Sequence, residues 1–127
     1  MNPVNLFDLA SQQARWLSVR QTTVAGNVAN INTPGFRTND VEPFEHVLDK
    51  SRVTMTTTHP THVALGATQD QFAVREIVDN DAATLPSDNT VVLEDEMLKA
   101  GEIGSSYQLN TSIVKAFHRM ILMAARS

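Results

Sequence analysis

Two groups of side chains in this sequence are of types that can bind a metal ion or transfer a proton. The first is the pair His59 and His62, which could share an ion with His46 or Asp70 as a further ligand. Pro60 restrains this segment, the chain has no cysteine, and no histidine–carboxylate pattern completes the three or four ligands of a zinc site. We therefore expect that the protein binds no metal and no cofactor. The alternative is a small metal-dependent enzyme that uses the two histidines.

The second group is the run of acids Glu94, Asp95 and Glu96 near the expected start of the last helix. Paired carboxylates can act as a general acid and base. Acids in the first turn of a helix more often complement the positive end of its dipole and face the solvent. No serine–histidine–aspartate pattern accompanies them, so the sequence predicts that the protein is not an enzyme.

The composition restricts the class of protein further. With 127 residues, of which 42% are hydrophobic, the chain can form one domain or one helical domain with an insert. A formal net charge of −4 argues against a nucleic-acid-binding protein, whose surface is basic. No apolar run approaches the ~18 residues of a membrane helix, and the N-terminus lacks the basic start of a secretory signal peptide. We expect no binding to nucleic acid and no direct insertion into a membrane.

Residues 5–31 are predicted to form one long helix. Apolar side chains recur along it at alternating spacings of three and four, which is typical of a coiled-coil seam. The seam consists of Phe7, Ala10, Ala14, Leu17, Gln21, Val24, Val28 and Ile31. A second, adjoining stripe consists of Leu6, Leu9, Gln13 and Trp16.

This helix is expected to stop in a hard turn at residues 26–36. The three asparagine side chains of the turn can hydrogen-bond the carbonyl groups that a helix end leaves free. Pro34 and Gly35 suit the two central positions of a type II turn, in which glycine takes positive φ without a clash.

The middle of the chain, residues 37–88, has weaker periodicity and reads as an insert. Residues 40–48 predict a short helix with a proline near its start. The β-branched segment 53–58 and the alternating segment 71–78 favour extended structure and could form a hairpin. We expect an insert that is poorly ordered or contains a β-hairpin.

A second long helix is predicted from about Val91 onward. Its seam has the same spacing and consists of Leu93, Met97, Ala100, Gly104, Tyr107, Thr111, Val114, His118, Ile121 and Ala125. The glycine-containing stretch 100–106 is unusual, since each glycine in a helix costs about 1 kcal/mol relative to alanine. Either the helix bends there or a neighbour approaches closely over small side chains.

The last turns of this helix are apolar nearly all round. Their apolar side chains are Ile113, Val114, Phe117, Met120, Ile121, Leu122 and Met123. Such a helix belongs inside a larger body, and the N-terminal helix can cover only one stripe of it. A monomer would expose a large apolar patch, so we expect burial against other chains in a head-to-tail assembly that forms a ring or a helical tube.

The turn and its flanks resemble a known signature. The segments 27–30 (Asn-Val-Ala-Asn) and 32–37 (Asn-Thr-Pro-Gly-Phe-Arg) are similar to the pattern N-I-A-N-x-x-T-P-G-Y/F-K/R of bacterial flagellar rod, hook and hook–filament junction proteins. The matching turn residues are Asn27, Asn30, Thr33, Pro34, Gly35 and Phe36. Within that group the short chain most resembles the proximal members of the flagellar basal-body rod protein family.

A second resemblance lies at the start of the C-terminal helix. Residues 89–97 (Asn-Thr-Val-Val-Leu-Glu-Asp-Glu-Met) are similar to the rod family's N-x-V-D/N-L/I-x-x-E-M. Val92 stands where the family has an aspartate or asparagine, so the usual side-chain cap is missing. We expect Thr90 or Asn89 to cap the helix one turn earlier.

The resemblance implies a structural subunit of the proximal rod, the drive shaft that passes torque from the membrane ring to the hook. It implies as partners other copies of the chain, the rod adaptor at the membrane ring, other rod proteins and the flagellar type III export gate. It also implies a place in the periplasmic part of the basal body, reached through the export system without a cleaved signal peptide. Phe44 and Leu48 fit the short apolar element that the export gate reads in such proteins.

We thus predict a mainly α fold, in which the N- and C-terminal long helices pair as an antiparallel coiled-coil-like hairpin. Residues 1–36 and 89–127 would form one discontinuous domain, with residues 37–88 as the insert. The side chains expected to pack between subunits are Leu9, Trp16, Leu17, Val24, Val28, Ile31, Met97, Tyr107, Val114, Phe117 and Ile121. A cytoplasmic helical binding module or export chaperone is the alternative function.

Overall fold

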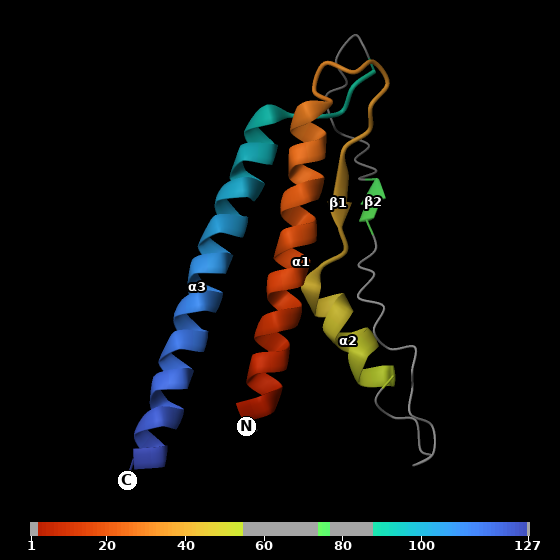
Figure 1. Ribbon diagram of the computed structural model, residues 1–127. Coiled ribbons are helices and arrows are strands. Elements are labelled where there is room, and N and C mark those ends of the chain that lie inside the picture. The colour runs from red at the N-terminus through yellow and green to blue at the C-terminus, as the bar shows by residue number, and fades with distance from the viewer. Residues whose placement is uncertain (1–2, 55–73, 77–87, 127) are drawn as a thin grey trace.

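The structure is a computed structural model that describes residues 3–54, 74–76 and 88–126, and its described part is mainly helical (Figure 1). Two long helices, α1 (Pro3–Ala29) and α3 (Leu93–Arg126), make up most of it. The prediction of a mainly α fold with long helices at both ends of the chain is confirmed.

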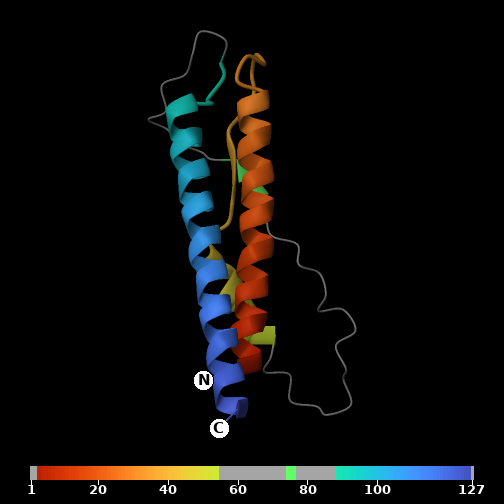
Figure 2. The ribbon, with the colours of Figure 1, turned by 60° about the vertical axis from the view of Figure 1, so that its left-hand side comes forward.

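The two long helices lie side by side in both views (Figures 1 and 2). The hydroxyl of Tyr107 donates to the carbonyl of Ala14 at 3.0 Å, and the side-chain amide of Asn110 donates to the carbonyl of Ala10 at 3.0 Å. Residue numbers therefore fall along α1 as they rise along α3. We call the end where α1 stops and α3 starts the turn end, and the opposite end the terminal end.

The buried apolar cluster of the described residues lies between these helices. It consists of Leu17, Val24 and Ile103, with Trp16 and Tyr107 packed against it. At the terminal end the rings of Phe7 and Phe117 meet edge to face, with centroids 5.7 Å apart. The cluster is small for helices of 27 and 34 residues, so much of their surface stays outside it.

The face of α3 that meets α1 differs from the predicted seam. Positions that are buried or half-buried recur every seven residues at Glu96, Ile103, Asn110 and Phe117, and Lys99 and Ser106 are half-buried beside them. Of the predicted seam, Tyr107 and Val114 are half-buried. The predicted positions one residue further along are exposed, namely Met97, Gly104, Thr111 and His118. The prediction was wrong here because hydrophobicity favoured methionine over glutamate, whereas the buried glutamate has hydrogen-bonding partners that the sequence does not reveal.

The glycine-containing stretch of α3 stays helical. Residues 100–106 continue the helix without a break, and no other part of the described chain lies within 4 Å of a side chain added at Gly101 or Gly104. No close neighbour from the described part of this chain therefore explains the two glycines.

The described part of the middle segment contains one short helix and two short strands. Helix α2 (Phe44–Thr54) follows β1 (Asn39–Val41), and β1 pairs antiparallel with β2 (Val74–Glu76). The prediction of extended structure is wrong at residues 53–54, which end α2, and is confirmed at residues 74–76, which form β2. The rest of the predicted segment 53–58 lies outside the described residues, so the predicted hairpin stays a prediction. The preference of β-branched residues for strands is weak, and the helix that starts at Phe44 continues through them. Residues 55–73 and 77–87 lie outside the described part.

Candidate functional site

The turn that follows α1 has the predicted geometry. Gly35 has φ +74°, and the amide of Phe36 donates to the carbonyl of Thr33 at 3.2 Å, which closes the turn. Positive φ at the third position of such a turn is the mark of type II. The side-chain amide of Asn30 donates to the carbonyl of Gly26 at 2.8 Å, as expected of an asparagine at a helix end.

Asn89 closes the same turn from the far end of the sequence. Its side-chain nitrogen lies 2.9, 3.0 and 2.8 Å from the carbonyl oxygens of Asn30, Ile31 and Thr33. Its side-chain oxygen accepts a hydrogen bond from the amide of Val91 at 2.8 Å, and the residue is 0% exposed. These are carbonyls that the end of α1 leaves without a helical partner. The start of the C-terminal segment therefore completes the end of the N-terminal helix.

Asn27 and Glu96 join the two long helices one turn further inside. The side-chain nitrogen of Asn27 donates to Glu96 Oε2 at 3.0 Å and to the carbonyl of Asn39 at 2.8 Å. The side-chain oxygen of Asn27 accepts from the amide of Asn39 at 3.1 Å. Both side chains are 1% exposed, so these bonds form away from water. One asparagine thereby holds α1, β1 and α3 together.

Charged side chains surround this pair. Lys99 Nζ lies 3.1 Å from Glu96 Oε1 and 3.9 Å from Asp40 Oδ2. Arg20 bonds Asp40 at 3.3 Å and Glu102 at 3.4 Å. The buried carboxylate of Glu96 is therefore compensated by a lysine and an amide, as a buried charge must be. We call Asn27, Asn89 and Glu96 the polar clasp.

Two expectations about this region need correction. Glu96 was expected to face the solvent with its two neighbours, but it is buried at the seam, while Glu94 and Asp95 are exposed. The prediction that Thr90 or Asn89 caps the helix was also wrong, since α3 starts only at Leu93. The Thr90 hydroxyl instead accepts a hydrogen bond from the backbone amide of Thr38 at 2.8 Å. Acids in a first turn are usually solvated, and only the seven-residue spacing from Ile103 pointed to a buried Glu96.

One of the two residues expected to contact the export gate, Phe44, lies against α1. The ring of Phe44 is 5.7 Å from the ring of Trp16, and both Phe44 and Leu48 are half-buried. The indole nitrogen of Trp16 donates to the carbonyl of Glu42 at 2.8 Å, and the guanidinium of Arg20 lies 5.5 Å from the indole ring. In the folded chain, Phe44 is therefore engaged by α1.

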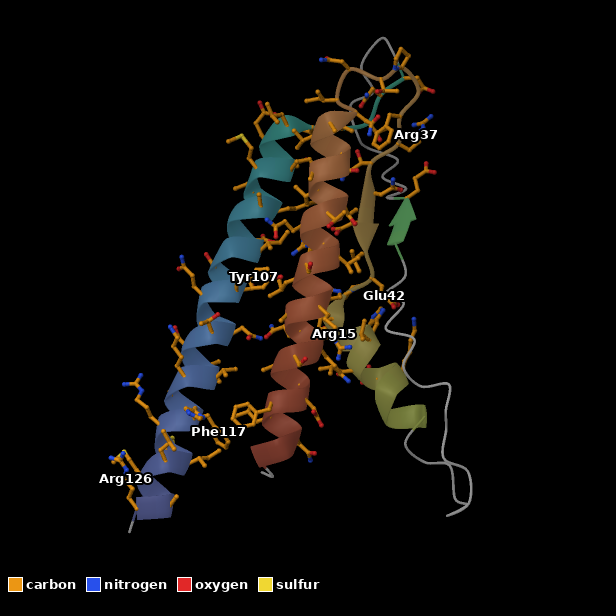
Figure 3. All side chains as sticks on the ribbon, in the orientation of Figure 1. Arg15, Arg37, Glu42, Tyr107, Phe117 and Arg126 are labelled. Atoms are coloured by element: carbon orange, nitrogen blue, oxygen red, sulfur yellow. The ribbon has the colours of Figure 1, made fainter. Side chains whose placement is uncertain are left out.

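Exposed apolar side chains follow α3 from one end to the other. They are Leu93, Met97, Leu98, Leu109, Ile113, Met120, Ile121, Leu122 and Met123. At the terminal end, Met120 is 63% and Met123 72% exposed, so most of these side chains is open to solvent in the single chain. Figure 3 shows Phe117 directed toward α1, whereas Arg126 points away from it. A methionine-rich apolar surface of this length is unusual for a protein that works alone.

The residues predicted to pack between subunits occupy three kinds of environment. Leu17 and Val24 are buried inside the chain, and Val28, Met97 and Ile121 are exposed. The half-buried members are Leu9, Trp16, Ile31, Tyr107, Val114 and Phe117. Of the turn residues, Asn27 is buried, Asn30 and Phe36 are half-buried, and Thr33, Pro34 and Gly35 are exposed.

The structure does not extend to the histidines proposed as metal ligands. His59 and His62 lie outside the described residues. Among the residues that are described, no group of three or more histidine, aspartate or glutamate side chains is arranged to hold a metal ion. No described helix is long and apolar enough to cross a membrane.

Comparison with known proteins adds two findings. The family described as "Flagella basal body rod protein" matches residues 11–37, which cover α1 from residue 11 to its end and the turn that follows. Over 129 aligned residues the chain is 48% identical to the flagellar basal body rod protein FlgB of Agrobacterium fabrum. That alignment covers 99% of this chain and 96% of the relative.

Proposed function

The chain belongs to the flagellar basal body rod protein family, and we propose that it is a subunit of the proximal rod that polymerises through its terminal helices. In this role it forms part of the drive shaft that passes torque from the membrane ring to the hook. It acts as a structural protein and not as an enzyme. The likeness to a rod protein along nearly its whole length disfavours a free binding module or export chaperone.

One observation carries the assembly proposal, namely the exposed apolar side chains along α3. Burial of apolar surface is worth about 25 cal/mol per Å², and single exposed methionine or leucine side chains would gain on the order of 1 kcal/mol each from a neighbour. The series from Leu93 to Met123 gives several such contacts along one helix. Neighbouring rod chains are the partners that would cover it.

The way in which α1 and α3 pair suits a shaft that transmits torque. The antiparallel, coiled-coil-like pairing of α1 and α3 gives a rigid rod-shaped unit, because the clasp and the apolar cluster hold both helices. Contacts between such units that resemble packed interiors resist sliding, because interiors are close-packed and deform little. Repetition of one such contact around an axis gives a tube rather than a closed pair.

Membership of the family suggests specific binding partners. We propose that the chain contacts the rod adaptor at the membrane ring and other rod proteins, and that it reaches the periplasmic space through the flagellar type III export gate. Phe44 and Leu48 would be read by the gate before the chain folds, because in the folded chain Phe44 packs on Trp16. The segments 1–36, 37–88 and 89–127 then serve as terminal helix, insert and second terminal helix.

The substitution Ile121→Asp tests the assembly proposal. Ile121 is 36% exposed at the terminal end of α3, so a carboxylate there is tolerated in the single chain but is costly inside an apolar contact. In a strain whose only copy of the gene carries this change, we expect normal protein levels, no rods in purified basal bodies and loss of swimming.

Ser112→Asp provides the matched control. It adds the same charge at an exposed polar position of the same helix, and swimming should be retained. Circular dichroism of both purified variants should show unchanged helix content. Normal swimming of the Ile121→Asp strain would refute an assembly role for this face.

A further inference from the structure

The seam between α1 and α3 repeats every seven residues, and a repeating seam allows more than one alignment. On α3 the positions Glu96, Ile103, Asn110 and Phe117 succeed one another at this spacing. A slip by one repeat would move α3 along α1 by about 10 Å and would bring an equivalent seam position into each place. The apolar cluster around Ile103 is small, so apolar packing alone selects weakly among these alignments.

The polar clasp accepts only one alignment. In the observed structure Glu96 Oε2 lies 3.0 Å from the Asn27 amide, and Asn89 meets the carbonyls that follow α1. After a slip that moves each α3 seam residue to the place of the next one, Glu96 would lie beside Leu17 and Val24. There its charge would be buried without a partner, which is strongly unfavourable.

We propose that the polar clasp of Asn27, Asn89 and Glu96 is a register lock that sets the axial position of α1 relative to α3. The clasp selects one alignment of the two helices more than it adds to the stability of the pair. A buried ion or amide pair stabilises little compared with apolar residues of the same size. Buried polar residues in coiled-coil seams are known to act in this way.

The lock matters for assembly because the register decides which exposed side chains of the two helices stand at the same level. A subunit slipped by one repeat would present its α3 face about 10 Å out of place to a neighbour. This consequence depends on the proposed function. The existence of the lock does not, and it can be measured on the purified chain.

The measurement uses the absence of cysteine from the chain. Ser18 on α1 and Ser112 on α3 are exposed, so Ser18→Cys and Ser112→Cys introduce two sites for spin labels without touching the seam. The Tyr107–Ala14 bond places Ser112 about two helical turns further toward the terminal end than Ser18. A one-repeat slip therefore changes the axial offset of the labels by about 10 Å in either direction, which double electron–electron resonance resolves.

With the clasp intact we expect one narrow distance distribution. Glu96→Leu combined with Asn89→Ala should give a second population displaced by several ångström, while circular dichroism shows that both helices are retained. Glu96→Leu alone should show the same second population at a lower fraction, and this variant decides the matter if the combined one loses helix. Glu96→Gln, which can still accept from Asn27, should keep the single distance.

Leu17→Ala separates register from stability. Leu17 is 1% exposed in the apolar cluster, so its truncation should lower the melting temperature and leave the single distance unchanged. The proposal is overturned if Glu96→Leu keeps one narrow distance, or if Leu17→Ala broadens the distribution as much as the clasp variants do. Failure of these experiments would leave the swimming test of the rod proposal unaffected.

Discussion

At the scale of single residues, Asn89 serves two elements at once. Its amide nitrogen completes the end of α1, and its oxygen orients the backbone just before α3. An aspartate has the same shape but lacks the donor, and an alanine lacks both groups. No other residue type offers a donor for three carbonyls and an acceptor for an amide in so short a side chain. The Arg37–Asp88 ion pair beside it, at 3.0 Å, is exposed and therefore adds little.

Asn89→Ala should destabilise the chain by about 1–3 kcal/mol, because the half-buried carbonyl of Ile31 loses the Asn89 donor and the carbonyls of Asn30 and Thr33 each keep only a backbone amide. Asn89→Asp should cost at least as much, since its carboxylate would face the same carbonyls. Urea denaturation followed by circular dichroism measures both changes.

The exposed Asn32 in the same turn is the reference for this prediction. Asn32→Ala should change the free energy of unfolding by less than about 0.5 kcal/mol. Equal effects at the two asparagines would show that Asn89 has no special part in closing the turn.

At the scale of elements, the long helices and the turn could be predicted from spacing and residue type, and the clasp could not. Phe7, Leu17 and Val24 gave the period of α1, and Pro34 with Gly35 gave the turn, because these depend on local geometry. The burial of Glu96 depends on Asn27, which is 69 residues away in the chain, and periodicity carries no information about such a partner. A prediction from hydrophobicity then assigns an apolar residue such as Met97 to the seam in place of Glu96.

The strands show a similar limit. Both β1 and β2 have only three residues, too few for an alternating pattern to stand out. The backbone of Asn39 is held by Asn27, so the start of β1 is set by a side chain of another element. Helix α2 was predicted at its start but ran further than expected, through β-branched residues whose preference for strands is weak.

The docking of α2 on α1 gives an element-scale prediction that uses Trp16, the one tryptophan of the chain. Phe44→Ala removes the ring that packs on it at 5.7 Å and should weaken the docking by about 1 kcal/mol. The indole should become more exposed, so its fluorescence emission should shift to longer wavelength while the helix content stays nearly constant.

Glu45→Ala is the control, because Glu45 lies next to Phe44 on α2 but is exposed. Its emission should match that of the unmodified chain. An unchanged emission maximum in Phe44→Ala would mean that α2 is not held to α1 through this ring.

At the scale of the whole molecule, the two ends of the helix pair are held very differently. The turn end has the clasp, the apolar cluster and the charged groups around Asp40. The terminal end has the contact between Phe7 and Phe117, and residues 118–126 of α3 are exposed throughout. Charge is also distributed unevenly along α3. Its first half contains the acids Glu94, Asp95, Glu96 and Glu102 and one base, Lys99, whereas its second half contains the bases Lys115, Arg119 and Arg126 and no acid.

Hydrogen exchange of the purified chain should follow this division. Amides of residues 14–28 and 96–107 should exchange slowest, and those of residues 115–126 should exchange at least tenfold faster, because local opening requires less buried contact to break. Mass spectrometry of peptides from both regions measures the ratio. Uniform protection along α3 would contradict the prediction.

The position of Asn89 in the chain also sets an order of events. A polypeptide that emerges N-terminus first from a ribosome presents α1 and its turn while the side chain that will seal them is still unmade. Residues 37–89 must follow before the Asn89 side chain is present. Until then the carbonyls of Asn30 and Thr33 have only the backbone amides of Thr33 and Phe36 as partners, and the carbonyl of Ile31 lacks the Asn89 donor. The turn itself can close early through the bond between Phe36 and Thr33, whereas the end of α1 is completed only after residue 89 has been synthesised.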